Sequence, residues 1–430
     1  MNRTPLGAGL RAFRHRNYRL FYAGQAISLV GTWMQSVAQA WLVLTLTNDP
    51  FWLGVVSAAQ FAPVVLFGLF GGLVADALPK RRALVVVQAA MMVLALLLWL
   101  LTATGAVTVT AVLVLALGLG VANAVDMPVR QSFVVEMVGR DDVANAVALN
   151  SAMFNGARVL GPAVAGLVIG AAGIAPAFLI NGLSFLAVIG GLLRMRDEEL
   201  VPVRLAERPR TMAQVRSALA EGLRYVRRTP PVLLATVVVG FVSTVAMNFQ
   251  VIVPAFARSV LGVGAEGFGF LMAASGVGSV LAALGLAFGR PRPSVLLGGA
   301  VVLGAAQVAL AGTTSYPVAA LLLFLAGAGG IAMAATANTT IQLAVPDGLR
   351  GRVMSVYTTV FAGSAPVGGL FVGSLASAAG IQAAVLVGGL LGVAVAVAAW
   401  AWWRLRWSGL ELAAPGSGEG AVPVSLRRVR

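Results

Sequence analysis

The longest polar stretch inside this chain covers residues 196–231 and reads RDEELVPVRLAERPRTMAQVRSALAEGLRYVRRTPP. On each side of it lie six mostly apolar runs, each close to the ~20 residues that an α-helix needs to cross a membrane. The chain has 59% hydrophobic and 10% charged residues, whereas a soluble globular protein carries roughly 25% charged residues. We therefore predict an all-α membrane protein with twelve transmembrane helices in two six-helix bundles.

The predicted spans are residues 18–46, 50–75, 82–104, 107–134, 143–171, 175–195, 232–260, 266–289, 294–312, 316–343, 352–378 and 381–403. The predicted domains are an N-terminal bundle with a basic N-terminal segment (1–196), a linker (197–231), a C-terminal bundle (232–407) and a disordered tail (408–430). Linker residues 212–228 have one apolar and one arginine-rich face, which predicts an amphipathic helix at the inner leaflet or in solvent. Gly161-Pro162 in span 5 and Ala365-Pro366 in span 11 occupy matching places, as a parallel internal duplication predicts.

The basic residues predict the orientation. Of the 30 lysines and arginines, 28 fall in the segments on the same side as the termini or at that boundary. Arg258 alone falls on the opposite side, and Arg158 lies within span 5. Because cytoplasmic loops hold the excess of Lys and Arg, both termini are predicted to be cytoplasmic in a cell-membrane protein. This distribution also accounts for the net charge of +15 without a nucleic-acid partner, and no cleavable signal peptide is expected.

The residues required by several other functions are missing. The chain has no cysteine, and its one histidine, His15, lies in the basic N-terminal segment, so we expect no metal site and no catalytic triad. It also has no Walker-type phosphate loop and no repeated filter element of a channel. We expect no cofactor, and a membrane-embedded enzyme is the remote alternative.

The loop after span 2 reads GGLVADALPKRRA from Gly71 to Ala83. An acid at a helix end followed by basic residues can form a charge latch between neighbouring helices; the alternative is a simple positively charged turn. The stretch resembles the loop signature of the major facilitator superfamily, although Ala77 and Pro79 depart from it and the matching loop at 288–292 lacks the acid. The predicted cytoplasmic gate consists of Gly72, Asp76, Lys80, Arg81 and Arg82.

A second resemblance lies in span 5, where Gly161, Pro162 and Gly166 permit close packing and a kink. This segment is similar to the fifth-helix motif of proton-coupled exporters in the superfamily. The longer stretch NAVDMPVRQ from Asn123 to Gln131, continued as far as this Gly-Pro, resembles the exporter subgroup that includes the enterobactin exporter and the macrolide efflux proteins. The resemblance implies alternating access by rocking of two bundles.

Few ionisable groups lie at membrane depth, and such groups are candidates for function by default. Asp126 and Arg130 are four residues apart in span 4, on one helical face, and Arg158 lies in the next span. We predict that these three residues form a network coupled to the access switch. The alternative is a static pair that seals the inner gate.

Uncharged polar residues are concentrated in spans 1, 4, 5, 7 and 10. In span 1 they recur at steps of three and four residues and form one stripe. The resemblance implies that spans 1, 4, 7 and 10 line the substrate cavity, although polar groups also serve as contacts between helices. The predicted cavity residues are Gln25, Ser28, Thr32, Gln35, Gln39, Asn123, Asn150, Phe154, Asn155, Asn248, Gln250 and Asn338.

These patterns predict a monomeric secondary transporter that exports a bulky small molecule of the drug or siderophore type, with protons as the coupling ion and membrane lipids as its surroundings. A lipid-type translocator or a small-solute importer on the same fold is the alternative.

Overall fold

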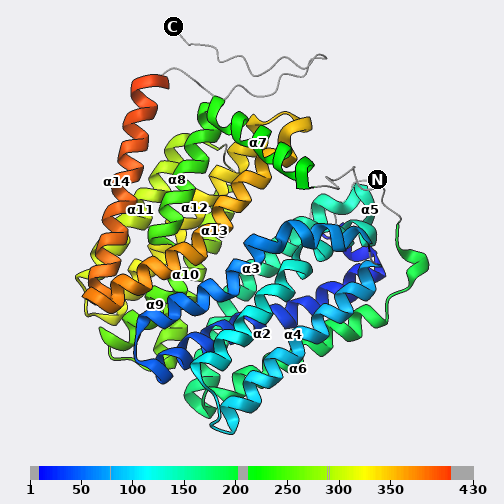
Figure 1. Ribbon diagram of the computed structural model, residues 1–430, viewed down its shortest axis with the longest axis horizontal. Coiled ribbons are helices and arrows are strands. Elements are labelled where there is room, and N and C mark those ends of the chain that lie inside the picture. Colours follow the sequence, from blue (N-terminus) through cyan, green and yellow to red (C-terminus); the bar gives the residue numbers. More distant parts are fainter. Residues whose placement is uncertain (1–8, 78, 202–211, 288, 290, 408–430) are drawn as a thin grey trace.

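A computed structural model of the protein describes residues 9–77, 79–201, 212–287, 289 and 291–407, and the described part is helical with no strand (Figure 1). The predicted fold is confirmed, with helices on both sides of the linker that form two six-helix bundles. The predicted tail 408–430 and linker residues 202–211 lie outside the described residues.

The N-terminal bundle follows a short 3-10 turn and ends at a second one. Its elements are η1 (Arg11–Arg14), α2 (Arg16–Thr47), α3 (Pro50–Ala77), α4 (Lys80–Ala103), α5 (Val109–Ala172), α6 (Ala175–Leu193) and η2 (Asp197–Glu199). The helix α5 contains two predicted spans, because the residues between them stay helical except at Gly139. Gly139 has φ 71°, a backbone conformation that glycine adopts without a steric penalty. It is the point where the chain turns back from span 4 into span 5.

The C-terminal bundle follows the linker helix α7 (Met212–Arg228). Its elements are α8 (Pro230–Ala246), α9 (Phe249–Ser259), α10 (Ala265–Leu286), α11 (Pro293–Ala311), α12 (Tyr316–Ala344), α13 (Asp347–Ala379) and α14 (Ile381–Trp407). Within the described residues, eleven helical segments are long and apolar enough to span a membrane. Because α5 is one of these segments and holds two spans, the predicted twelve are accounted for.

The predicted seventh span is interrupted, which the sequence did not lead us to expect. The helix α8 ends at Ala246 and α9 starts at Phe249. The Nδ2 atom of Asn248 donates to the carbonyl of Thr244 at 2.7 Å, and Nε2 of the fully buried Gln307 in α11 donates to the carbonyl of Ala246 at 2.5 Å. These side chains satisfy carbonyl groups that a continuous helix would bond internally.

The predicted amphipathic helix is present as α7 and packs on protein. Its Val226 is buried, Tyr225 donates to the carbonyl of Ala344 at 3.0 Å, and Glu221 pairs with Arg352 at the start of α13. The helix therefore docks on the ends of α12 and α13, on the side of the membrane that carries both termini.

In the part of the chain that the structure describes, the two bundles meet toward one end. In Figure 1 their ribbons adjoin near α9 and diverge toward the end where α2 begins and α14 ends, next to the described termini of the chain. We call these ends the far side and the termini side. On the far side, Trp41 of α2 stacks on Phe268 of α10 with ring centroids 5.8 Å apart. A Cβ atom on Gly54 of α3 would overlap the carbonyl oxygen of Gly369 in α13, so these two helices touch through their backbones.

Candidate functional site

The second half of α5 lies between the bundles. Gly161 faces α2, because a Cβ there would overlap Trp33. Gly166 faces α10, because a Cβ there would lie 2.9 Å from the carbonyl oxygen of Glu266. Successive residues of a helix are rotated by 100° around its axis. Arg158 therefore lies between these two faces of α5, and Phe154 lies close to the face that contacts α2. These side chains therefore border the space between α2 of one bundle and α10 of the other.

The three predicted helix-5 residues thus form contacts on two faces of α5. Gly161 brings α5 against α2 within its own bundle, whereas Gly166 and the carbonyl of Pro162 meet α10 of the other bundle, the latter at Gly269. Pro366 of α13 holds the matching place in the other half. The nearby Gly369 meets α3, so each half presents a proline-containing helix to the other.

Aromatic and cationic groups meet on the termini side of this contact. The ring of Phe154 is 47% exposed and lies edge-on to that of Trp33, with centroids 5.7 Å apart. The guanidinium of Arg158 lies 6.0 Å from the centroid of the Trp33 ring. Among the described residues, no carboxylate lies within ion-pair distance of Arg158. The result is a surface that combines two aromatic rings with one unpaired cation.

The predicted polar stripe of span 1 is mostly engaged inside the bundle. Asn181 of α6 donates to Gln35 at 2.6 Å, and Gln39 lies 3.5 Å from Gln60 of α3. Gln25 and Ser28 are buried as well, and Thr32 alone is exposed. The helical period predicts that these residues lie on one face of α2. In the structure, part of that face packs against the neighbouring helices α3 and α6.

The other predicted cavity amides also bond mostly within their own bundle. Four of them bond to a residue four positions away in the sequence: Asn123 to Leu119, Asn155 to Ser151, Asn338 to Gln342 and, across the break between α8 and α9, Asn248 to Thr244. Asn150 instead accepts a hydrogen bond from Tyr18 of α2 at 3.0 Å. Gln250 is partly exposed in α9. The hydrogen bond of Asn150 thus links two helices, whereas those of Asn123, Asn155 and Asn338 stay within one helix.

The predicted charge network is present in part. Asp126 is 2% exposed and pairs with Arg130 at 3.2 Å. Its other oxygen accepts a hydrogen bond of 2.8 Å from Gln88 in α4, which the sequence analysis did not single out. Arg158 contacts neither member of the pair and lies against Trp33 instead. Gln88 could have been noticed, because it is the one amide in an otherwise apolar span and a buried amide needs a partner.

Two basic residues of the predicted gate form ion pairs with acids that the prediction did not include. Lys80 pairs with Glu136 of α5 at 2.5 Å, and Arg81 pairs with Asp197 at 2.7 Å while it donates to the carbonyl of Leu192. Arg82 is exposed. Gly72 and Asp76 lie in α3, but their side chains are outside the described part of the structure. The contacts that the structure describes for Lys80 and Arg81 lie within the N-terminal bundle.

The N-terminal segment is fastened next to Gly139. Asp142, 3% exposed, lies 2.8 Å from Nε2 of His15 and 2.7 Å from the guanidinium of Arg14. Asn145 accepts from the backbone of Ala12 at 2.9 Å. The hydrogen bond with His15, and then the charge of Arg14, hold the pKa of Asp142 below its usual value. Folding therefore favours the ionised carboxylate.

From this we expect Asp142→Asn to lower the free energy of unfolding by about 1.5–3 kcal/mol at neutral pH, the contribution of hydrogen bonds to a charged group. Because the pKa is lowered on folding, the stabilisation is complete above the ordinary value of ~3.9 and is lost as the pH falls through the lowered value. Thermal unfolding of the purified protein should show a constant difference from pH 8 to 5 and a smaller one below about pH 4. Asp141→Asn, at an exposed neighbouring position, should change neither.

Comparison with known proteins agrees with this architecture. A family model described as transmembrane secretion effector matches residues 7–414. The multidrug efflux pump Tap of Mycolicibacterium fortuitum is 29% identical over 368 residues, which cover 83% of this chain and 88% of the pump. The staphyloferrin A transporter of Staphylococcus aureus is 24% identical over 173 residues, 40% of this chain and 44% of that protein. The chain thus spans less than half of this second relative.

Solved structures share the fold at lower identity. A bacterial homologue of the human lysosomal transporter Spinster, in an inward-facing and unoccupied conformation, has a TM-score of 0.69 at 16% identity, over 91% of this chain and 96% of that one. A POT family transporter in complex with a thioalcohol-conjugated peptide has a TM-score of 0.73 at 9% identity, again over 91% and 96%. The family match over nearly the whole sequence shows that this chain belongs to the transmembrane secretion effectors of the major facilitator superfamily, and so is a multi-pass membrane transporter of small molecules and not an enzyme.

Proposed function

We propose that this transporter is a proton-coupled exporter of bulky, partly apolar small molecules that works by alternating access. The observation that carries the proposal is the one-sided contact between the bundles. Close backbone contacts between α3 and α13, and between α5 and α10, lie on the far side. Two rigid bundles that touch at one end and diverge at the other can rock against each other, so that the end in contact opens while the open end closes.

The direction of transport depends on the orientation in the membrane. The excess of Lys and Arg on the termini side favours a cytoplasmic location for that side. In this orientation the bundles diverge toward the cytoplasm, the side from which an exporter loads its substrate. The names of two relatives, a multidrug efflux pump and a staphyloferrin A transporter, support export of a drug or siderophore.

The chemistry near α5 supports a large and partly aromatic substrate. The exposed ring of Phe154 and the ring of Trp33 offer flat apolar surface, and the unpaired Arg158 offers one positive charge. Aromatic side chains bury a large apolar area against a ligand, whereas a single cation favours a substrate that carries an acidic or carbonyl group.

We expect inverted membrane vesicles that contain the protein to accumulate a fluorescent aromatic drug that carries a carboxyl group, such as norfloxacin, when a proton gradient, acid inside, is imposed. A protonophore should abolish the accumulation, and right-side-out vesicles should show none under the corresponding gradient. The test variant combines Phe154→Ala with Trp33→Ala and should reduce drug transport but leave protein level and thermal unfolding close to those of the wild type. Uphill uptake by right-side-out vesicles, or transport that ignores the protonophore, would contradict export or proton coupling respectively.

A further inference from the structure

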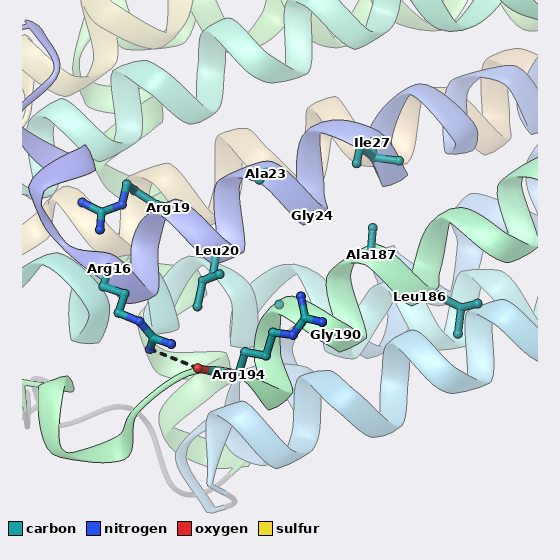
Figure 2. A pocket seen from close by; sticks show the side chains of 11 residues that line it. Arg16, Arg19, Leu20, Ala23, Gly24, Ile27, Leu186, Ala187, Gly190 and Arg194 are labelled. Carbon is teal, nitrogen blue, oxygen red and sulfur yellow. Dashed lines mark hydrogen bonds between the residues drawn. The ribbon is translucent and has the colours of Figure 1, made fainter.

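A groove of about 570 Å³ runs between α2 and α6 of the N-terminal bundle (Figure 2). Its polar end is formed by Arg16, Arg19 and Arg194. Its wall is apolar and includes the small residues Ala23, Ala187 and Gly190. We infer that this groove binds one anionic phospholipid, with the phosphate at the three arginines and an acyl chain along the small residues.

The first argument is charge. Among the described carboxylates, none lies within ion-pair distance of these three arginines, because Asp142, Asp197 and Glu199 pair with other basic residues. Arg16 donates to the carbonyl of Arg194 at 3.0 Å. The guanidinium of Arg194 itself has no hydrogen-bond partner in the part of the chain that the structure describes, and in Figure 2 it lies between the two helices beside Gly190. Its charge is therefore available to an anion.

The second argument is shape. The two helices touch at the floor of the groove, where a Cβ on Gly24 would lie 2.7 Å from the carbonyl oxygen of Ala187. Above this floor, a Cβ on Gly190 would have no neighbour within 4 Å. Farther from the arginines, Ile27 and Leu186 are 57% and 51% exposed. In a membrane transporter these exposed apolar side chains face lipid tails, so the groove opens toward the bilayer.

The third argument is depth. Arg16 and Arg19 begin the first transmembrane helix and Arg194 follows the last residue of the sixth. All three therefore lie at the membrane boundary on the termini side, at the level of the headgroups. Basic pockets between transmembrane helices at this level bind anionic headgroups. A soluble anion would need only the arginines, whereas the apolar wall below them is explained by an acyl chain.

The test is native mass spectrometry of the full purified chain, titrated with phosphatidylglycerol or with phosphatidylcholine. We expect one phosphatidylglycerol to bind at least about fivefold more tightly than phosphatidylcholine, and Arg194→Gln to remove about a fivefold preference, the effect of one arginine near an anionic lipid. Because no described residue accepts a hydrogen bond from the guanidinium of Arg194, this variant removes no hydrogen bond that the structure describes. The matched control is Arg404→Gln, at an exposed arginine near the end of α14, which should bind like the wild type.

A second variant tests the apolar part of the groove without a change of charge. Gly190→Leu fills the open space above the floor and should weaken phosphatidylglycerol binding, while Gly298→Leu, at an equally open position in α11, should not. Millimolar inorganic phosphate should fail to displace the lipid. Equal binding of phosphatidylglycerol by the wild type, Arg194→Gln and Gly190→Leu would overturn the proposal. Displacement by inorganic phosphate would also overturn it, because the groove would then be a site for a soluble anion.

Discussion

Replacing Gly54 with valine should reduce transport at least about tenfold, the effect of 1.4 kcal/mol on the balance between two states. Gly54 of α3 lies against the carbonyl of Gly369 in α13, and a Cβ there would overlap that oxygen. Because the obstacle is backbone, a side-chain movement cannot relieve the overlap, and overpacking of this kind typically destabilises a contact by 1–3 kcal/mol. The state that is closed on the far side should therefore lose population.

The shift can be measured with single cysteines, since the natural chain has none. Ser57→Cys lies beside Gly369 at the far-side contact, and Ser151→Cys is exposed on the termini side of α5. In purified protein, Gly54→Val should increase maleimide labelling at position 57 and decrease it at position 151. A change in both positions in opposite directions is the mark of a change of state, because general loosening would increase both.

Two further glycines serve as controls for this experiment. Gly156 of α5 has open space around its Cβ position, so Gly156→Val should leave transport and labelling unchanged. Gly327 of α12 meets the carbonyl of Ser275 within the C-terminal bundle. Gly327→Val should therefore lower the yield of folded protein, but it should not change the labelling at positions 57 and 151 in opposite directions. Normal transport and unchanged labelling in Gly54→Val would show that the far-side contact does not limit the cycle.

The positions of the helices could be predicted well from the sequence, because membrane insertion depends mainly on the length and hydropathy of each segment. The predicted second span, 50–75, and α3 (Pro50–Ala77) differ by two residues at one end. The break between α8 and α9 could not be predicted. It contains no glycine or proline, and it depends on the amide of Gln307, which is 61 residues away from Ala246 in the sequence.

The individual partners in the site were harder to predict for the same reason. Helical period correctly placed Gln35 and Gln39 on one face, but the neighbours of that face, Asn181 and Gln60, come from other helices. Likewise, the spacing of four residues predicted the pair of Asp126 and Arg130 but contained no information about Arg158. Contacts within one helix follow from the sequence, whereas contacts between helices depend on rotations that hydropathy does not specify.

Asp126→Asn should abolish proton movement coupled to substrate while leaving passive exchange of substrate largely intact. The carboxylate is buried inside span 4, and its two oxygens are engaged by Arg130 and Gln88. A buried ionisable group in a transmembrane helix is expensive to maintain, and asparagine keeps the shape and the hydrogen bond from Gln88 while it removes the charge. If the group takes up and releases the coupling proton, substrate-induced proton flux in proteoliposomes should fall to the level of protein-free vesicles.

The alternative function of this pair, a static seal between helices, predicts a different result. A seal without a proton-carrying role would lose stability in Asp126→Asn, because Arg130 would remain at membrane depth without its counter-charge, but the ratio of protons to substrate would stay unchanged. Glu136→Gln is the matched control in the same helix, since Glu136 pairs with Lys80 near the termini side and should affect stability alone. The ratio of proton flux to substrate flux, measured together in one preparation, therefore decides whether Asp126 belongs to the transport cycle or only to the packing of the bundle.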